Sequence, residues 1–182
     1  DRWGILIGGR LDKHNMVDNV IFSPRANLRF NPTQNINLRL SYSSGFRAPQ
    51  AFDEDMHIEN VGGTVAMIER AKNLKEEKSQ SFSVSADMYH RFGAFQTNLL
   101  IEGFYTRLTD VFVLGKPYDR GDGILVKTRS NGPGAKVMGL TLEGKVAYLS
   151  ILQIQAGLTL QRSRYDEPHK WHDDAPAEKK IF

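Results

Sequence analysis

The sequence predicts an all-β fold in which antiparallel up-and-down strands form part of a large transmembrane β-barrel, with long loops at one end and short turns at the other. Three observations predict this fold. Apolar and polar residues alternate along successive segments. The polar positions hold side chains suited to a face in contact with water, and the connections fall into a short and a long class. The alternation is clearest from Ser23 to Tyr42, where two strands flank the polar turn NPTQN.

The amino-terminal part supplies the first three of about seven expected strand segments. Trp3–Asp12 alternates Ile5 and Ile7 with other residues, and a polar loop follows it. Ser23–Phe30 and Ile36–Ser44 hold their apolar residues at even positions and their polar residues at odd ones. With only a short polar turn between them, these two segments are expected to pair as a hairpin.

The middle of the chain reads as a long loop followed by two strands. A long irregular stretch is expected over residues 45–79, after which Gln80–His90 alternates apolar residues with serines. RFGAFQ at 91–96 is a short turn that contains glycine, and Thr97–Gly115 is expected as one long strand. Gln80–His90 therefore has one solvated face.

Two further strand segments complete the alternating pattern. Ile124–Ser130 reaches a kink or bulge at NGPG, residues 131–134, and Ala135–Tyr148 continues beyond it. Leu152–Arg164 is the last clear strand, and residues 165–180 are expected to form a polar loop. The short connections are NPTQN, RFGAFQ and the 149–151 corner. In an up-and-down arrangement they all fall at one end.

A soluble β-sandwich is the alternative fold at this point, because two sheets that bury their apolar faces against each other also alternate. The apolar positions of the cleanest strands hold no charge, which fits lipid and a dry core equally. Phe30 and Tyr148 lie beside short turns, where membrane barrels place aromatic girdles, although aromatic residues are also common in ordinary strands. Sorting of the connections by length favours the barrel.

Composition excludes several classes of protein. The apolar share of 40% and charged share of 25% fit a folded chain rather than a disordered one. No apolar run approaches the roughly 18 residues that a membrane helix needs. The absence of cysteine excludes disulfides and thiolate chemistry, and the net charge of +3 is spread along the chain rather than gathered in a block. Nucleic-acid binding is therefore not expected.

Four segments of the sequence contain recognisable motifs. They are SPRANLRFNP with SYSSGFRAP at 23–32 and 41–49, NLKEEKSQSF at 73–82, FYTRLTDVF at 104–112, and SNGPGAKVMGLTLEG at 130–144. In order and spacing they resemble the barrel of TonB-dependent outer-membrane receptors, the active transporters of Gram-negative bacteria. The resemblance spans nearly the whole chain, with Glu76 standing where the family usually has proline.

This resemblance implies a barrel of about 22 strands closed around a plug, of which residues 1–182 form a partial β-barrel domain. Because Asp1 lies within the alternating pattern, we interpret the chain as a fragment and expect the plug, the TonB box and the other strands outside it. The resemblance further implies location in the cell outer membrane, contact with its lipid, and coupling to TonB through the absent plug.

The matched motif residues have structural interpretations of their own. Gly45 and Pro49 flank the point where a strand turns into a loop, and Arg47 is placed to tie that turn to a carboxylate or a carbonyl. Asn131 opens the permissive NGPG segment. Gly139 allows a close neighbour, and Glu143 on the wet face is expected to pair with an arginine from another strand or from the plug.

No catalytic signature is present: the sequence lacks a Gly-x-Ser-x-Gly elbow, a phosphate-binding loop and a His-Glu-x-x-His motif. We therefore expect no enzyme activity, no cofactor and no resident metal. Carboxylates and imidazoles gather in two loops, where they are either solvated loop charge or contacts to a ferric complex or a corrin. With Arg47, the candidate ligand-binding residues are Asp53, Asp55, His57, His169 and His172.

Two functions from different classes remain open on this reading. The first is an outer-membrane receptor that binds a scarce ligand, such as a ferric siderophore, haem or cobalamin, and imports it with energy from TonB. The second is a soluble β-sandwich or small barrel that binds a partner with the loop over residues 45–79. Coordinates that bury the apolar positions inside a double layer would favour the second function.

Overall fold

The structure is a computed structural model that describes residues 2–15, 17, 19–49, 66–121, 123–149, 151–169 and 178–181. These residues form twelve strands: β1 Trp3–Asp12, β2 Ile21–Thr33, β3 Ile36–Arg47, β4 Ala66–Arg70, β5 Glu77–Phe92, β6 Phe95–Thr109, β7 Phe112–Leu114, β8 Tyr118–Asp119, β9 Leu125–Asn131, β10 Ala135–Tyr148, β11 Leu152–His169 and β12 Glu178–Ile181. Among the described residues there is no helix long and apolar enough to cross a membrane.

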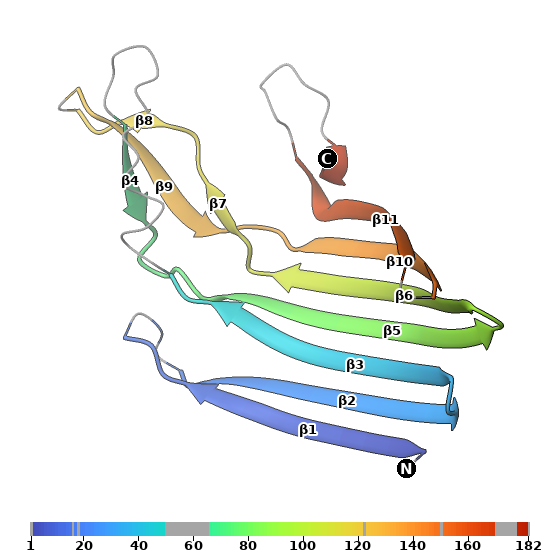
Figure 1. The fold of residues 1–182 in the computed structure, drawn as a ribbon. Helices are drawn as coiled ribbons and strands as arrows, with labels where there is room; N and C mark the ends of the chain where they lie inside the picture. Colours follow the sequence, from blue (N-terminus) through green and yellow to red (C-terminus); the bar gives the residue numbers. More distant parts are fainter. Residues whose placement is uncertain are drawn as a thin grey trace.

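Eight of the strands form one main sheet in the order β1-β2-β3-β5-β6-β10-β11-β12. Each strand pairs antiparallel with its neighbour, and the sheet is twisted and curved (Figure 1). The predicted antiparallel up-and-down arrangement is confirmed. The remaining strands form a smaller sheet in the order β4-β9-β7, with β8 paired to β9, and this sheet lies beyond one end of the main sheet (Figure 1).

The connections sort by length as predicted. The connections β2–β3, β5–β6 and β10–β11 are short, and the longer connections, including the two that carry the small sheet, lie at the opposite end (Figure 1). Gly93 and Leu149 have φ angles of 58° and 50°. Tight reversals between strands require this left-handed backbone, which glycine adopts without steric cost.

The sequence-based strand boundaries are wrong at several places. The stretch 45–79 is not irregular throughout, because β3 runs to Arg47, β4 occupies Ala66–Arg70 and β5 begins at Glu77. The expected strand Thr97–Gly115 breaks at Asp110, where φ is 54°. Residues 165–180 are not simply a loop, because β11 continues to His169 and β12 pairs with it. Polar composition hid these extensions, since pairing beyond an apolar band does not need apolar residues.

Register keeps the two faces of the main sheet separate. One row of directly paired residues crosses seven strands as Ile5, Leu28, Leu40, Val84, Gly103, Leu140 and Leu160. The adjacent row, on the opposite face because side chains alternate, is Gly4, Arg29, Arg39, Ser85, Glu102, Thr141 and Thr159. We call the two sides the apolar face and the polar face.

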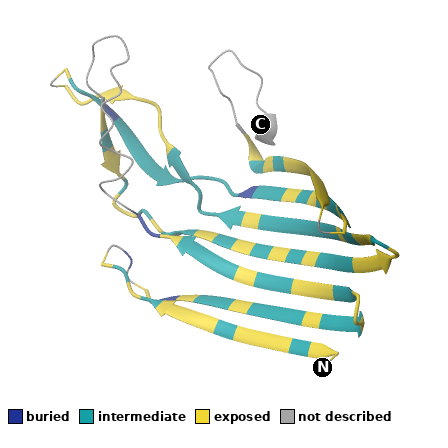
Figure 2. Ribbon diagram, viewed as in Figure 1, coloured by how far each residue is buried: buried dark blue, intermediate teal, exposed yellow. Residues whose placement is uncertain are grey.

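The apolar face is open rather than packed. Val84 and Leu160 are 59% and 62% exposed, and exposed and partly buried positions alternate along the strands in Figure 2. Among the described residues the buried apolar side chains are Val17, Ile21, Ala48, Pro49, Val126 and Ala135. No second layer of described residues covers the apolar face, so the β-sandwich alternative is wrong.

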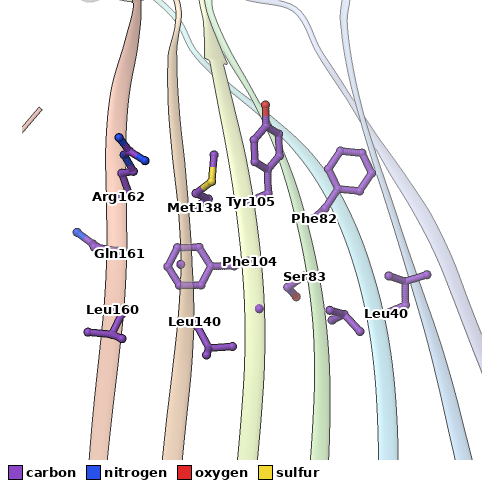
Figure 3. A pocket seen from close by; sticks show the side chains of 13 residues that line it. Leu40, Phe82, Ser83, Phe104, Tyr105, Met138, Leu140, Leu160, Gln161 and Arg162 are labelled. Carbon is purple, nitrogen blue, oxygen red and sulfur yellow. The ribbon is translucent and has the colours of Figure 1, made fainter. Parts of the chain in front are cut away.

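Aromatic rows bound the apolar face at both ends. At the turn end Phe92, Phe95 and Tyr148 are neighbours in register, with ring centroids 5.5 and 4.9 Å apart. Towards the loops, Tyr42, Phe82 and Tyr105 form the matching row, with Met138 next in register, and part of it is visible in Figure 3. The rows are separated by about ten residues, which is roughly 34 Å along a strand. With the usual tilt this gives a band close to the ~25 Å height of outer-membrane barrels.

Gly139 of β10 lies against the Phe104 ring on the polar face. A Cβ placed there would be 2.6 Å from the Phe104 ring and 2.6 Å from the Leu160 carbonyl oxygen, and Figure 3 shows the Phe104 ring lying over β10. Gly144 on the same strand has open space at its Cβ position. Gly139 therefore admits the Phe104 ring against the backbone, which fits the expected close neighbour.

We predict that Gly139→Ala lowers the free energy of unfolding by about 2 kcal/mol, because the contact with a backbone carbonyl forces strand displacement. The matched variant Gly144→Ala should change it by no more than about 0.5 kcal/mol. Denaturant titration of the full-length protein in detergent measures both values. Equal effects of the two substitutions would contradict this packing.

Candidate functional site

The polar face of the main sheet is lined by hydroxyl, amide and charged side chains that bond across strands. Side chains on neighbouring strands join in pairs, among them Asn37 to Asn31 at 2.8 Å, Ser41 to Asn27 at 2.6 Å, Ser81 to Thr106 at 2.9 Å, and Thr141 to Thr159 at 3.1 Å. Such pairs hold the strands in register while leaving further donors and acceptors for water. The arrangement suits a hydrated surface.

An arginine-lined hollow occurs on this polar face near β1. Its volume is about 410 Å³, and Asn27, Arg29 and Arg39 supply its polar lining. Arg29 and Arg39 are directly opposite each other on β2 and β3, and the described residues provide neither with a hydrogen bond or an ion pair. Like charges in directly opposed positions destabilise a strand pair. The hollow is therefore suited to an anionic group.

The small sheet is built within the connections at the loop end. β4 runs parallel to β9, which also pairs antiparallel with β7 and β8. Val126 of β9 is completely buried, and Arg120 contacts Glu69 at 3.4 Å between exposed side chains. Two connections distant in sequence, 48–76 and 110–134, are thereby joined into one structure.

Asn131 ties the base of the small sheet to the main sheet. Its Oδ1 accepts a hydrogen bond from the Lys75 backbone N–H at 2.8 Å, and its Nδ2 donates to the carbonyls of Lys75 at 3.0 Å and Asp110 at 2.8 Å. The bend at Asp110 is further held because the Gly132 N–H donates to the Val111 carbonyl at 2.7 Å. One amide side chain therefore satisfies three backbone groups from two other parts of the chain, at Lys75 and Asp110.

Arg47 lies at the same junction, at the loop end of β3. It is paired in register with Glu77, and its guanidinium lies 5.6 Å from the centre of the Phe112 ring. Glu77 in turn accepts a hydrogen bond from the Phe112 backbone N–H at 3.0 Å. These contacts place Arg47 beside the Phe112 ring at the loop end of β3. That Arg47 ties this turn to a carboxylate or a carbonyl stays a prediction.

Glu76 precedes β5 and is mostly buried, with 12% of its side chain exposed. Burial alone would raise its pKa, but a hydrogen bond from Lys78, a hydrogen bond with its own backbone and the charges of Lys78 and Lys75 together hold the pKa of Glu76 below its usual range. The Lys78 Nζ lies 3.0 Å from the Glu76 Oε1. This carboxylate replaces the proline usual in the resembled motif.

The other motif residues are placed as follows. A Cβ at Gly45 would lie 3.0 Å from the Ser79 Oγ, and Pro49 follows the end of β3 as a buried residue. Glu143 is half-buried on the polar face of β10, next to Gly157 of β11. The described residues give Glu143 no ion pair or hydrogen bond, so its expected arginine partner is not found among these strands.

The loop candidates predicted from the sequence fall mainly outside the described residues. Asp53, Asp55, His57 and His172 all lie there, and for His169 the structure describes only the backbone, which pairs with Glu178. The described residues contain no group of three or more metal-ligating side chains. Arg47 is thus the one ligand-binding candidate whose side-chain environment can be specified.

A hollow on the apolar face differs from the arginine-lined one in chemistry. It has a volume of about 690 Å³ and is lined largely by apolar and aromatic side chains such as Leu40, Tyr105 and Leu140 (Figure 3). Few polar groups converge there, so a polar ligand finds little to bind. The arginine-lined hollow was missed by sequence reasoning, although the NPTQN turn contained the signal: correct pairing across it places Arg29 opposite Arg39.

Comparison with known proteins yields a family and several similar folds. The model of the family described as TonB dependent receptor-like, beta-barrel matches residues 1–180. No curated protein matches the chain.

Solved structures give fold matches at low identity. The FrpB iron transporter from Neisseria meningitidis, F5-1 variant, is 18% identical with a TM-score of 0.65, and the match covers 100% of this chain and 26% of that one. The siderophore receptor PirA from Pseudomonas aeruginosa is 18% identical with a TM-score of 0.66, covering 90% of this chain and 34% of that one. FrpB of the F3-3 variant is 19% identical with a TM-score of 0.59, covering 90% and 22%. The chain thus spans about a third or less of these proteins.

We predict that Asn131→Ala loosens the base of the small sheet, because three backbone groups lose their partner at about 1 kcal/mol each. Hydrogen exchange at the Lys75 amide, measured in the full-length receptor, should accelerate at least tenfold. The matched control is Asn98→Ala, which removes an amide bonded to Asp87 at the turn end and should leave Lys75 unchanged. Unaltered protection of Lys75 in Asn131→Ala would contradict the anchoring role.

The lowered pKa of Glu76 means that its ionised form stabilises the folded state. Because the folded state binds a proton at Glu76 less readily than the unfolded chain does, the contribution is present at neutral pH and disappears as the pH falls below about 4. We expect the free energy of unfolding, measured by urea titration, to fall less between pH 7 and pH 3 in Glu76→Gln than in the parent. The exposed position Glu167→Gln is the control, and an equal loss in parent and Glu76→Gln would refute the assignment.

Proposed function

The chain belongs to the TonB-dependent receptor β-barrel family, and we propose that it forms part of the wall of an outer-membrane receptor that binds a scarce small-molecule ligand and imports it with energy supplied through TonB. Receptors of this family are transport proteins, and the proposed chemistry is binding and passage without bond cleavage. We therefore propose no enzyme activity for this chain.

The separation of the two faces is the observation that carries this proposal. An uncharged apolar band of about the height of an outer membrane, bounded by aromatic rows, is suited to face lipid. A polar face with bonded hydroxyl and amide pairs is suited to line a hydrated lumen. The long connections at one end are suited to capture a ligand before it enters.

We propose that residues 1–182 are a section of a larger closed barrel rather than a complete one. The main sheet is open, with β1 and β12 each paired on one side only. Open edges are a liability that closure removes. The similar structures are roughly three to five times longer than the matched segment, which leaves room for the remaining strands and a plug.

The chemistry of the polar face favours an anionic cargo within the proposed ligand classes. Arg29 and Arg39 stand opposed without partners in the described residues, and Arg25 lies on the same face of β2. Ferric chelates of catecholate or carboxylate type and haem carry negative charge, whereas corrinoids lack a strong anionic group. The names of the similar proteins, an iron transporter and a siderophore receptor, agree with a ferric chelate.

The loop end is the proposed site of first contact. Arg47 and the loop residues Asp53, Asp55, His57, His169 and His172 remain candidates for that contact on chemical grounds. Arg47 is also engaged with Phe112 and the base of the small sheet, so its replacement would disturb the structure as well as any ligand contact. A double substitution His169→Ala with His172→Ala tests the loop without that complication.

We predict that the full-length receptor binds an anionic ferric chelate more tightly than a cationic ferric trihydroxamate or cyanocobalamin. The double variant Arg29→Gln with Arg39→Gln should reduce uptake of the anionic chelate at least tenfold, because the lumen loses its unpaired positive charge. Fluorescence titration measures binding, and transport of radioactive iron by cells that express the receptor measures uptake.

The control for this experiment is Arg10→Gln, because the Arg10 guanidinium is already paired with Asp12 at 2.6 Å. It should leave uptake within about twofold of the parent. Binding of none of the ferric chelates, haem or cobalamin would refute the receptor function. Unchanged uptake by the arginine double variant would refute only the proposed charge preference.

A further inference from the structure

A row of positive charge lies on the apolar face just beyond its aromatic boundary at the loop end. Arg107 of β6 is directly opposite Lys136 of β10, and Lys136 is directly opposite Arg164 of β11. Arg162 occupies the next position of β11 on this face towards the apolar band, beside Met138. We call Arg107, Lys136, Arg162 and Arg164 the basic row.

The row lies on the same face as the apolar band because side-chain direction repeats every second residue. Arg107 follows Tyr105 on β6, Lys136 precedes Met138 on β10, and Arg164 follows Arg162 and Leu160 on β11. Figure 3 shows Arg162, Met138, Tyr105 and Phe82 side by side across adjacent strands. The positive charge thus begins where the apolar band ends.

Opposition of like charges in three neighbouring strands is unfavourable unless an anion lies among them. The described residues supply a single carboxylate to the row: Asp166, whose Oδ1 lies 2.8 Å from the Lys136 Nζ. Arg107, Arg162 and Arg164 are exposed, and the described part of the chain gives them no ion pair or hydrogen bond. The row therefore keeps a net positive charge directed away from the lumen.

The row is also hollowed. A cavity of about 230 Å³ is lined by Lys136, Met138, Arg162, Arg164, Tyr165 and Asp166. Three of these residues are cations, and Met138 continues the lining into the apolar band. A ligand that fills this cavity combines an anionic group beside the cations with an apolar part next to Met138.

We propose that the basic row binds the phosphate group of a lipid headgroup in the membrane leaflet on the loop side. Guanidinium groups match phosphate oxygens in geometry and charge, and the depth of the row, directly beyond the aromatic boundary, is that of headgroups when the band is embedded. This inference rests on the proposed function, because it requires the apolar face to lie in lipid. A free phosphate ion offers the same anionic chemistry without the apolar part that would contact Met138.

The test uses the full-length receptor in phosphatidylcholine nanodiscs, with phosphatidic acid as the phosphate-bearing probe. Native mass spectrometry measures retained phosphatidic acid for the parent and for the triple variant Arg107→Gln, Arg162→Gln, Arg164→Gln. The control, Arg10→Gln, Arg91→Gln, Lys145→Gln, removes the same charge from other positions. We expect the apparent dissociation constant to rise at least tenfold in the triple variant and to stay within about twofold in the control.

Equal retention of phosphatidic acid by parent and triple variant would overturn the proposal. So would displacement of the lipid by inorganic phosphate at equal concentration, which would identify a free anion as the occupant. If the triple variant fails to fold, the double variant Arg162→Gln with Arg164→Gln is measured instead, with a threefold rise as its threshold. Ferric chelate binding by the same samples separates failure of this inference from failure of the proposed receptor function.

Discussion

The structure depends on the in-register alternation of its main sheet. Rows of directly paired residues run across seven strands, and adjacent rows belong to opposite faces. A slip of one residue in any strand would exchange its faces and place Arg29 or Glu102 among leucines. At the midplane of a bilayer an Arg on the apolar side costs about 2–4 kcal/mol. Since no second layer of described residues packs on the apolar face, register is specified by the separation of the two faces rather than by a packed core.

The ends of the sheet follow from the same constraint. Where the apolar requirement stops, the strands continue with polar residues, and their backbone groups still need partners. At the loop end Asn131 supplies three such partners at the base of the small sheet. At the turn end, connections such as residues 93–94 leave little backbone to satisfy. The main sheet thus leads into a separately organised small sheet that lies beyond its loop end (Figure 1).

The sequence is sufficient to predict some of these features and not others. β1 and β10 have the predicted boundaries. β4, β7 and β8 have only five, three and two residues, too few for a period of two to show. The parallel partner of β4, strand β9, is also distant in the chain. The motif at Asn131 indicated a permissive bulge. Its hydrogen bonds to Lys75 depend on a contact 56 residues distant, which no local pattern encodes. The sequence could have predicted that Arg29 lies opposite Arg39, but only once the residue pairing across the NPTQN turn was known.

The most direct test of the two-faced wall is solvent accessibility along β10. Spin labels are placed one at a time, by cysteine substitution, at positions 138–148 of the full-length receptor in lipid bilayers, and relaxation by oxygen and by a water-soluble nickel complex is measured. We expect oxygen access to peak at even positions such as Leu140 and Leu142, and nickel access to peak at odd positions such as Thr141 and Glu143. Accessibility without a period of two, or with the two relaxation agents exchanged, would contradict the account.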